Sequence, residues 1–108
     1  MLSINVCEDT LVIYVEAKGL DVNVGAVFKQ EVAPLLDTPL DHVVLDLASV
    51  AYIDTFGLSA LIYALNCARR KWKTFHLTNV APAVKYILEL TRLVELFPIE
   101  PSRQKLVV

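Results

Sequence analysis

The sequence has little of what marks secreted, membrane-spanning or nucleic-acid-binding proteins. Only two of its 108 residues are cysteines, and the formal net charge of −2 leaves no basic excess for a nucleic-acid surface. The one basic cluster, RRKWK at 69–73, follows a helical segment whose negative end cations complement. The apolar part of that segment is about a dozen residues, short of the ~20 that span a bilayer. The first residues, MLSINVCEDT, show no basic region followed by an apolar run and a cleavage site. We therefore expect one soluble, cytoplasmic domain without membrane insertion or direct nucleic-acid binding.

The chain also lacks the residue patterns of catalytic and metal centres. Neither His42 nor His76 has a second ligand at metal-binding spacing, and Cys7 and Cys67 fall in different predicted elements. No Ser/Cys–His–Asp spacing, pair of carboxylates or Gly-rich phosphate loop is visible. A threonine without a neighbouring base is a poor nucleophile at neutral pH. These absences predict a protein that is not an enzyme, holds no cofactor or metal, and acts by binding a partner.

The chain is organised around residues 43–65, VVLDLASVAYIDTFGLSALIYAL. The first five residues of this stretch are β-branched or apolar on both alternating faces, which is typical of a central strand covered on two sides, and Asp46 is their one polar interruption. From Leu58 onward, apolar residues recur at three- and four-residue intervals, which predicts a buried helix. Asp54 and Thr55 come just before it, and either side chain can accept a hydrogen bond from the free N–H groups at the start of the helix.

The remaining periodicity predicts an α/β fold. A helix capped by Asp21 or Asn23 should bend or end near Pro34, and Pro82 suits the first turn of a helix that reaches Leu90. Together these elements predict a mixed four- to five-stranded β-sheet with helices packed against it, in the order β-β-α-β-α-β-α-β. Alternation predicts the strands over residues 2–6, 11–17, 43–47, 74–78 and 96–99, with Pro98 marking the last as a sheet edge.

Several motifs give the chain a resemblance to a known family. The segment LDLASVAYIDTFGLSAL follows a pattern of an apolar strand ending in Asp, then Val, Ile-Asp, a hydroxyl residue, one further residue and Gly-Leu. The match extends back to KGLD at 18–21 and forward to LTNV at 77–80 and LTRL at 90–93. These residues resemble the STAS domain of anti-sigma factor antagonists, also called anti-anti-sigma factors. The resemblance implies a single STAS domain over residues 1–108.

The same resemblance implies a function for Thr55. In these antagonists the hydroxyl residue directly after the Asp receives a phosphate from the anti-sigma factor, a serine/threonine kinase, and Thr55 is the matching residue. The unphosphorylated protein would dock on this ATP-binding kinase and release a sigma factor. Phosphate, with about −1.5 to −2 charges at pH 7, would prevent docking. Gly57 would let the partner's backbone come close, whereas Leu58 would pack inward. The expected partner-binding residues are Asp21, Asp54, Thr55, Phe56, Gly57 and Leu58.

Other interpretations of these residues stay open. One is that Thr55 serves only as a helix N-cap. The chain also resembles the small STAS subunits that bind the ATPase of bacterial lipid-transport ABC complexes, where the hydroxyl would be an unmodified contact residue. A nucleotide- or small-molecule-binding sensor is a third alternative, which rests on the fold alone.

Three features depart from the family pattern. Phe56 stands where a small residue is usual, and it is either an obstacle to a kinase or an apolar anchor for a different interface. Trp72 and Lys73 replace the glycine expected after the central helix, and we expect partial core packing of Trp72 rather than an exposed partner contact. The tail 100–108 has no amphipathic period, so the C-terminal helix should be short or absent. The apolar surface left open would be covered by LVV at 106–108 or by a second subunit in a homodimer.

Overall fold

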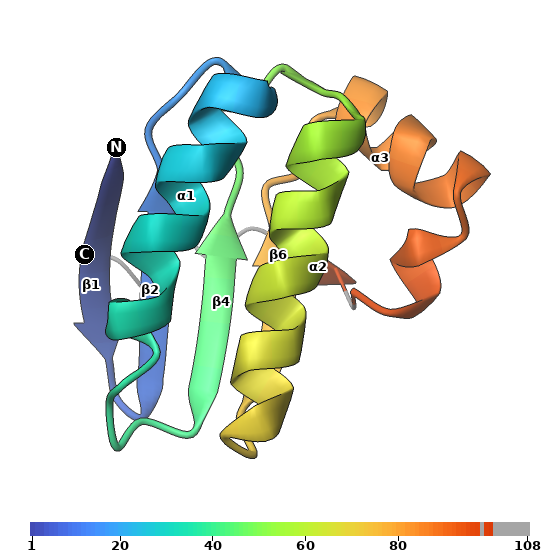
Figure 1. Ribbon diagram of the computed structural model, residues 1–108. Helices are drawn as coiled ribbons and strands as arrows, with labels where there is room; N and C mark the ends of the chain where they lie inside the picture. The colour runs from blue at the N-terminus through green and yellow to red at the C-terminus, as the bar shows by residue number, and fades with distance from the viewer. Residues whose placement is uncertain (98, 101–108) are drawn as a thin grey trace.

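The fold is a mixed sheet with two helices packed across one face. The computed structural model describes residues 1–97, 99 and 100. In this part of the chain β1 (Leu2–Cys7) runs antiparallel to β2 (Thr10–Val15), and the other neighbouring strands are parallel. Helices α1 (Val22–Leu35) and α2 (Thr55–Arg70) lie side by side in front of the sheet, and α3 (Pro82–Leu90) lies beyond them to one side (Figure 1). The five strands of the main sheet stand in the order β1 (Leu2–Cys7), β2 (Thr10–Val15), β4 (His42–Asp46), β6 (Thr74–Thr78) and β7 (Ile99–Glu100). The predicted order of elements is confirmed.

The core forms between the sheet and the first two helices. β4 lies between β2 and β6, and every residue after its first is buried, as predicted for a central strand. Ile13 of β2 and Leu45 of β4 share the helix-facing side of the sheet with the buried Phe28 of α1 and Leu61 of α2. Each such side chain contributes about 1.5–3 kcal/mol when it leaves water. This burial holds α1 and α2 in fixed positions on the sheet.

Local residue types account for the ends of the helices. α1 ends at Leu35, directly after Pro34, because proline donates no backbone hydrogen bond and its ring clashes with the preceding turn. α3 begins at Pro82 and ends at Leu90, as predicted, because the missing N–H of proline costs nothing in the first turn.

Two short strands differ from the prediction. β3 (Gly19–Leu20) and β5 (Tyr52–Ile53) pair in a small parallel sheet, although residues 49–53 are too few and too mixed for the pattern to indicate a full strand. The last strand is Ile99–Glu100 rather than 96–99, because Leu93–Glu95 forms a 3₁₀ turn and Phe97 is buried in the core. The predictions for Pro98, for the C-terminal helix and for residues 106–108 lie outside the described residues.

The end of α2 corrects the prediction for Trp72. Lys71 is the C-cap, and Trp72 has a φ of 59°, in the left-handed region where glycine is usual. Its N–H donates to the carbonyl of Arg69 at 3.0 Å. The N–H of Lys73 donates to the carbonyl of Ala68, also at 3.0 Å, which completes a Schellman motif. The indole is 93% exposed, so the expected core packing is wrong. α2 therefore has its left-handed terminator without the glycine, at a backbone cost of about 1–2 kcal/mol.

Replacing Trp72 with glycine should stabilise the folded protein. Glycine adopts a positive φ without a Cβ penalty, and the exposed indole contributes almost no burial energy. We expect the free energy of unfolding to rise by about 0.5–1 kcal/mol, after subtracting the entropy that glycine adds to the unfolded chain. Urea denaturation of dilute protein, followed by circular dichroism, measures it. Trp72→Ala is the matched control, because alanine keeps the penalty. Equal stability of the two variants would contradict the prediction.

Candidate functional site

Two helices begin at the same end of the molecule, where the predicted site residues lie (Figure 1). The segments that lead into them are joined by β3 and β5, in which Gly19 pairs with Tyr52 and Leu20 pairs with Ile53. The backbone N–H of Asp54 then donates to the carbonyl of Leu20 at 3.1 Å. Because one aspartate follows each of these strands, the pairing brings the two predicted aspartates to adjoining helix N-termini.

Each of these aspartates caps its helix. Asp21 Oδ1 accepts hydrogen bonds from the backbone N–H groups of Asn23 and Val24, at 3.1 and 3.0 Å. Asp54 Oδ1 accepts one from the N–H of Gly57 at 3.0 Å. Both carboxylates face the positive end of a helix dipole, which stabilises their negative charge. Of the two candidates for the cap of α2, Asp54 takes the role.

Thr55 is the first residue of α2, and its side chain is exposed. The interpretation of Thr55 as the N-cap is therefore wrong. In the part of the chain that the structure describes, its hydroxyl has no hydrogen-bond partner. The first N–H groups of a helix have no partner within it. Asp54 satisfies that of Gly57, so those of Thr55 and Phe56 remain available to an anion beside the hydroxyl.

Gly57 is a buried contact within the chain. A Cβ at this position would lie 2.2 Å from the carbonyl oxygen of Leu20 and 2.7 Å from Cγ1 of Ile53. We expected Gly57 to admit the backbone of a partner, and the structure corrects this: the glycine admits the backbone of Leu20. Leu58 is 8% exposed and packs inward, as predicted. These two residues hold the site from beneath.

Phe56 lies at the side of a groove between α1 and α2, and its side chain is 57% exposed. The helices approach closely here, since a Cβ on Gly25 would lie 3.2 Å from the carbonyl oxygen of Phe56. The sequence pattern does not indicate Val22 or Ala26 as site residues, because neither belongs to the apolar stripe that α1 turns to the core. The groove, of about 220 Å³, is lined by Val22, Gly25, Ala26, Lys29, Phe56 and Ser59.

Asp46 supports the loop that carries the site. One of its carboxylate oxygens accepts from the backbone N–H of Ala48, and the other accepts from the Nδ2 amide of Asn79, both at 2.9 Å. Asn79 has a φ of 55°, which asparagine tolerates better than most residues. The polar interruption in β4 thus ties the start of the loop to the residue that follows β6.

The described residues include no group of three or more His, Cys, Asp or Glu side chains that could hold a metal ion. Cys7 and Cys67 are both free thiols. Among the helices of residues 1–97, 99 and 100, none has the length and apolar content needed to cross a bilayer.

Solved structures share this fold over nearly the whole chain. A Thermotoga maritima protein assigned as an anti-sigma factor antagonist has a TM-score of 0.84 and 23% identity, over 97% of this chain and 89% of its own. The anti-sigma factor antagonist SpoIIAA, in its unphosphorylated form, has a TM-score of 0.78 and 11% identity, over 97% and 90%. A sulfate transporter family protein from Wolinella succinogenes has a TM-score of 0.80 and 15% identity, over 95% and 85%. At these identities the likeness concerns the fold, which is that of small α/β domains found in regulators and transporters.

The family model of the STAS domain matches residues 2–106. The chain therefore belongs to the STAS domain family, as its sequence motifs predicted.

The contact between Gly57 and Leu20 predicts a strong effect of one methyl group. Gly57→Ala should lower the free energy of unfolding by about 2–3 kcal/mol, because the clashing atom is a backbone oxygen held by the β3–β5 pair. Gly25→Ala is the matched control. Its Cβ would meet Phe56 O at 3.2 Å, and alanine gains about 0.5–1 kcal/mol in a helix, so we expect a change near zero. Urea denaturation compares the two, and equal losses would argue against the role given to Gly57.

Proposed function

We propose that this STAS protein is a cytoplasmic, non-enzymatic anti-sigma factor antagonist whose docking is controlled by phosphorylation of Thr55. The unphosphorylated form docks on an ATP-binding anti-sigma factor, a serine/threonine kinase, and this docking releases a sigma factor. The position of Thr55 carries the proposal. Its exposed hydroxyl stands at the first residue of a helix and, among the described residues, bonds to nothing.

A phosphate on Thr55 is compatible with the folded state. Because the hydroxyl is exposed, a kinase can reach it without any unfolding of the protein. The phosphate would then lie beside the free N–H groups of Thr55 and Phe56. An anion at a helix N-terminus gains about 0.3–1 kcal/mol from the dipole. The modification should therefore change the surface and leave the fold intact.

The same phosphate would oppose docking. The carboxylates of Asp21 and Asp54 already lie at this end of the molecule. A further −1.5 to −2 charges, roughly, would make the surface strongly anionic. Like charges that meet at an interface cost several kcal/mol. A partner shaped to the unmodified surface would be released.

The contact surface combines an apolar groove with a polar edge. Phe56 and Val22, which are 57% and 51% exposed, offer apolar area at the groove. Asp21 directly precedes Val22, and Asp54 and Thr55 directly precede Phe56, so these polar residues lie next to the groove in the chain. The buried Gly57 and Leu58 hold the first turn of α2 in place. Interfaces typically pair a buried aromatic anchor with such a rim. The likeness to SpoIIAA, described in an unphosphorylated form, supports this proposal.

Phosphorylation of Thr55 can be tested together with its effect on docking. Incubation with the host's anti-sigma kinase and ATP should add one phosphate to Thr55, located by mass spectrometry, and none to Thr55→Ala. Thr55→Glu should bind the kinase at least tenfold more weakly than wild type, because it places a permanent charge beside Asp54. Thr55→Gln has the same size without the charge and should bind as wild type does.

Equal binding of the Glu and Gln variants, or a phosphate on another residue, would overturn the switch. Capture of a transporter ATPase from the host by all the variants would instead support an ABC-complex subunit, with Thr55 as an unmodified contact.

Phe56 should contribute to docking without contributing to stability. Phe56→Ala should weaken kinase binding by about 1–2 kcal/mol, or roughly 5- to 30-fold, as expected for an aromatic anchor. The free energy of unfolding should change by less than about 0.5 kcal/mol, because the ring is largely exposed. Tyr86→Ala is the matched control, since Tyr86 of α3 is 59% exposed but lies away from the groove. Calorimetric titration with the kinase measures the binding of both variants, and urea denaturation measures their free energies of unfolding. Equal effects of the two substitutions on binding would exclude Phe56 as an anchor.

A further inference from the structure

The end of the molecule opposite to Thr55 carries an exposed aromatic side chain. α2 is 16 residues long, so its two ends lie about 24 Å apart. Beyond its last turn, Trp72 is the most exposed large hydrophobic residue of the described chain, at 93%. Its left-handed backbone costs stability, and its indole obtains almost no packing within the chain in return. Tryptophan is the residue type most enriched among interface hot spots, where one ring buries 150–250 Å², roughly. Trp72 therefore has the properties of an anchor for another molecule.

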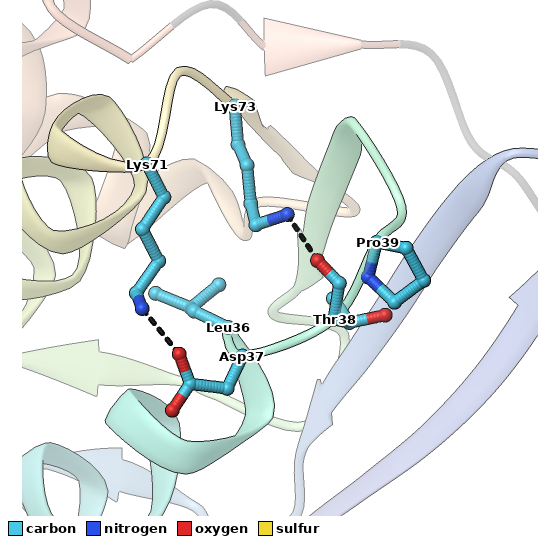
Figure 2. A pocket seen from close by; sticks show the side chains of 6 residues that line it. All are labelled: Leu36, Asp37, Thr38, Pro39, Lys71 and Lys73. Atoms are coloured by element: carbon cyan, nitrogen blue, oxygen red, sulfur yellow. Dashed lines mark hydrogen bonds and ion pairs between the residues drawn. The ribbon is translucent and has the colours of Figure 1, made fainter.

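A hollow of about 370 Å³ is lined by the two residues that flank Trp72 in the sequence, Lys71 and Lys73 (Figure 2). It lies between the end of α2 and the loop that connects α1 to β4, and it is lined by Leu36, Asp37, Thr38, Pro39, Lys71 and Lys73. Lys71 and Lys73 are the chain neighbours of Trp72, so the aromatic residue and the hollow lie at the same end of the molecule.

The walls of this hollow are held by their own contacts. Lys73 Nζ donates to the carbonyl oxygens of Thr38 and Leu40, both at 2.6 Å. Lys71 Nζ pairs with a carboxylate oxygen of Asp37 (Figure 2). The hydrogen bond from Lys71 lowers the pKa of Asp37. The exposed Pro39 and the aliphatic stem of Lys71 offer an indole atoms to pack on, and a lysine ammonium group is attracted to the face of such a ring.

The charges around the hollow complement one another. Within the described chain, Arg69 and Arg70 have no carboxylate partner, and the Asp41 carboxylate has no cationic partner. Asp41 lies at the same end of the molecule, because its carbonyl accepts from the N–H of Thr74, two residues after Trp72, at 3.0 Å. Arg69, Arg70 and Asp41 thus lie at the same end of the molecule as the ring and the hollow.

The geometry points to a symmetric homodimer in which Trp72 of each copy inserts into the hollow of the other. A two-fold interface requires a surface that is complementary to itself. This end of the molecule can meet that requirement, because it carries the exposed ring, an open hollow, and side chains of both charges without an ion partner. To bind a different protein, this chain would need only the ring or the hollow, and charges of only one sign. The inference goes beyond the proposed function and does not depend on it, since Thr55 lies at the other end of α2.

Sedimentation velocity over a dilution series tests the dimer. From about 1 μM to about 1 mM, the range of modest interfaces, wild type should pass from 12.0 kDa toward twice that mass. Trp72→Gly and Trp72→Asn should remain monomeric or dissociate at least tenfold more readily. Both residues tolerate the left-handed backbone, so this loss would accompany unchanged or higher thermal stability. Thr55→Glu should dimerise as wild type does.

Fluorescence supplies a second readout, because Trp72 is the only tryptophan in the sequence. Its emission should shift to the blue over the same concentrations at which the mass doubles, as the ring leaves water. A wild type that stays monomeric throughout would overturn the inference. So would a dimer that forms equally well in Trp72→Gly, or one in which the emission keeps the wavelength of a water-exposed indole.

Discussion

The contact between Gly57 and the backbone of Leu20 is the constraint on which the geometry of the candidate site depends. It allows the first turn of α2 to lie directly on the β3–β5 pair, with no side chain between them. Asp54 leaves that pair and caps α2, so Thr55 and Phe56 are displayed at the surface. A larger residue at position 57 would lift this turn and displace both.

Two helix N-termini at one end of the chain also set the electrostatics of the site. Each dipole is complemented by an aspartate, yet capping uses only some of the free N–H groups. The remaining N–H groups can donate hydrogen bonds to a further anion at Thr55, whereas that anion would make the surface as a whole more negative. A modification can therefore be tolerated by the fold and still be unfavourable for a partner.

The opposite end of α2 breaks a local rule. The left-handed position after the C-cap is one at which glycine is favoured, and this chain places its only tryptophan there. The folded monomer obtains little burial from that choice. Rules of local structure are usually broken where function compensates for the lost stability, which is why this end merits comparison with the end that carries Thr55.

The sequence by itself determined the order of the five strands of the main sheet and of the three helices, because periodicity reports which side chains face the core. It also determined the start of α3 at Pro82 and the end of α1 near Pro34, and its motifs identified the family and six residues around Thr55. Only the tertiary structure decided that Asp54 rather than Thr55 caps α2, that Gly57 receives the backbone of its own chain, and that Val22 borders a groove. Each of these depends on contacts between β3, β5 and the two helices, segments far apart in sequence, about which the local pattern carries no information.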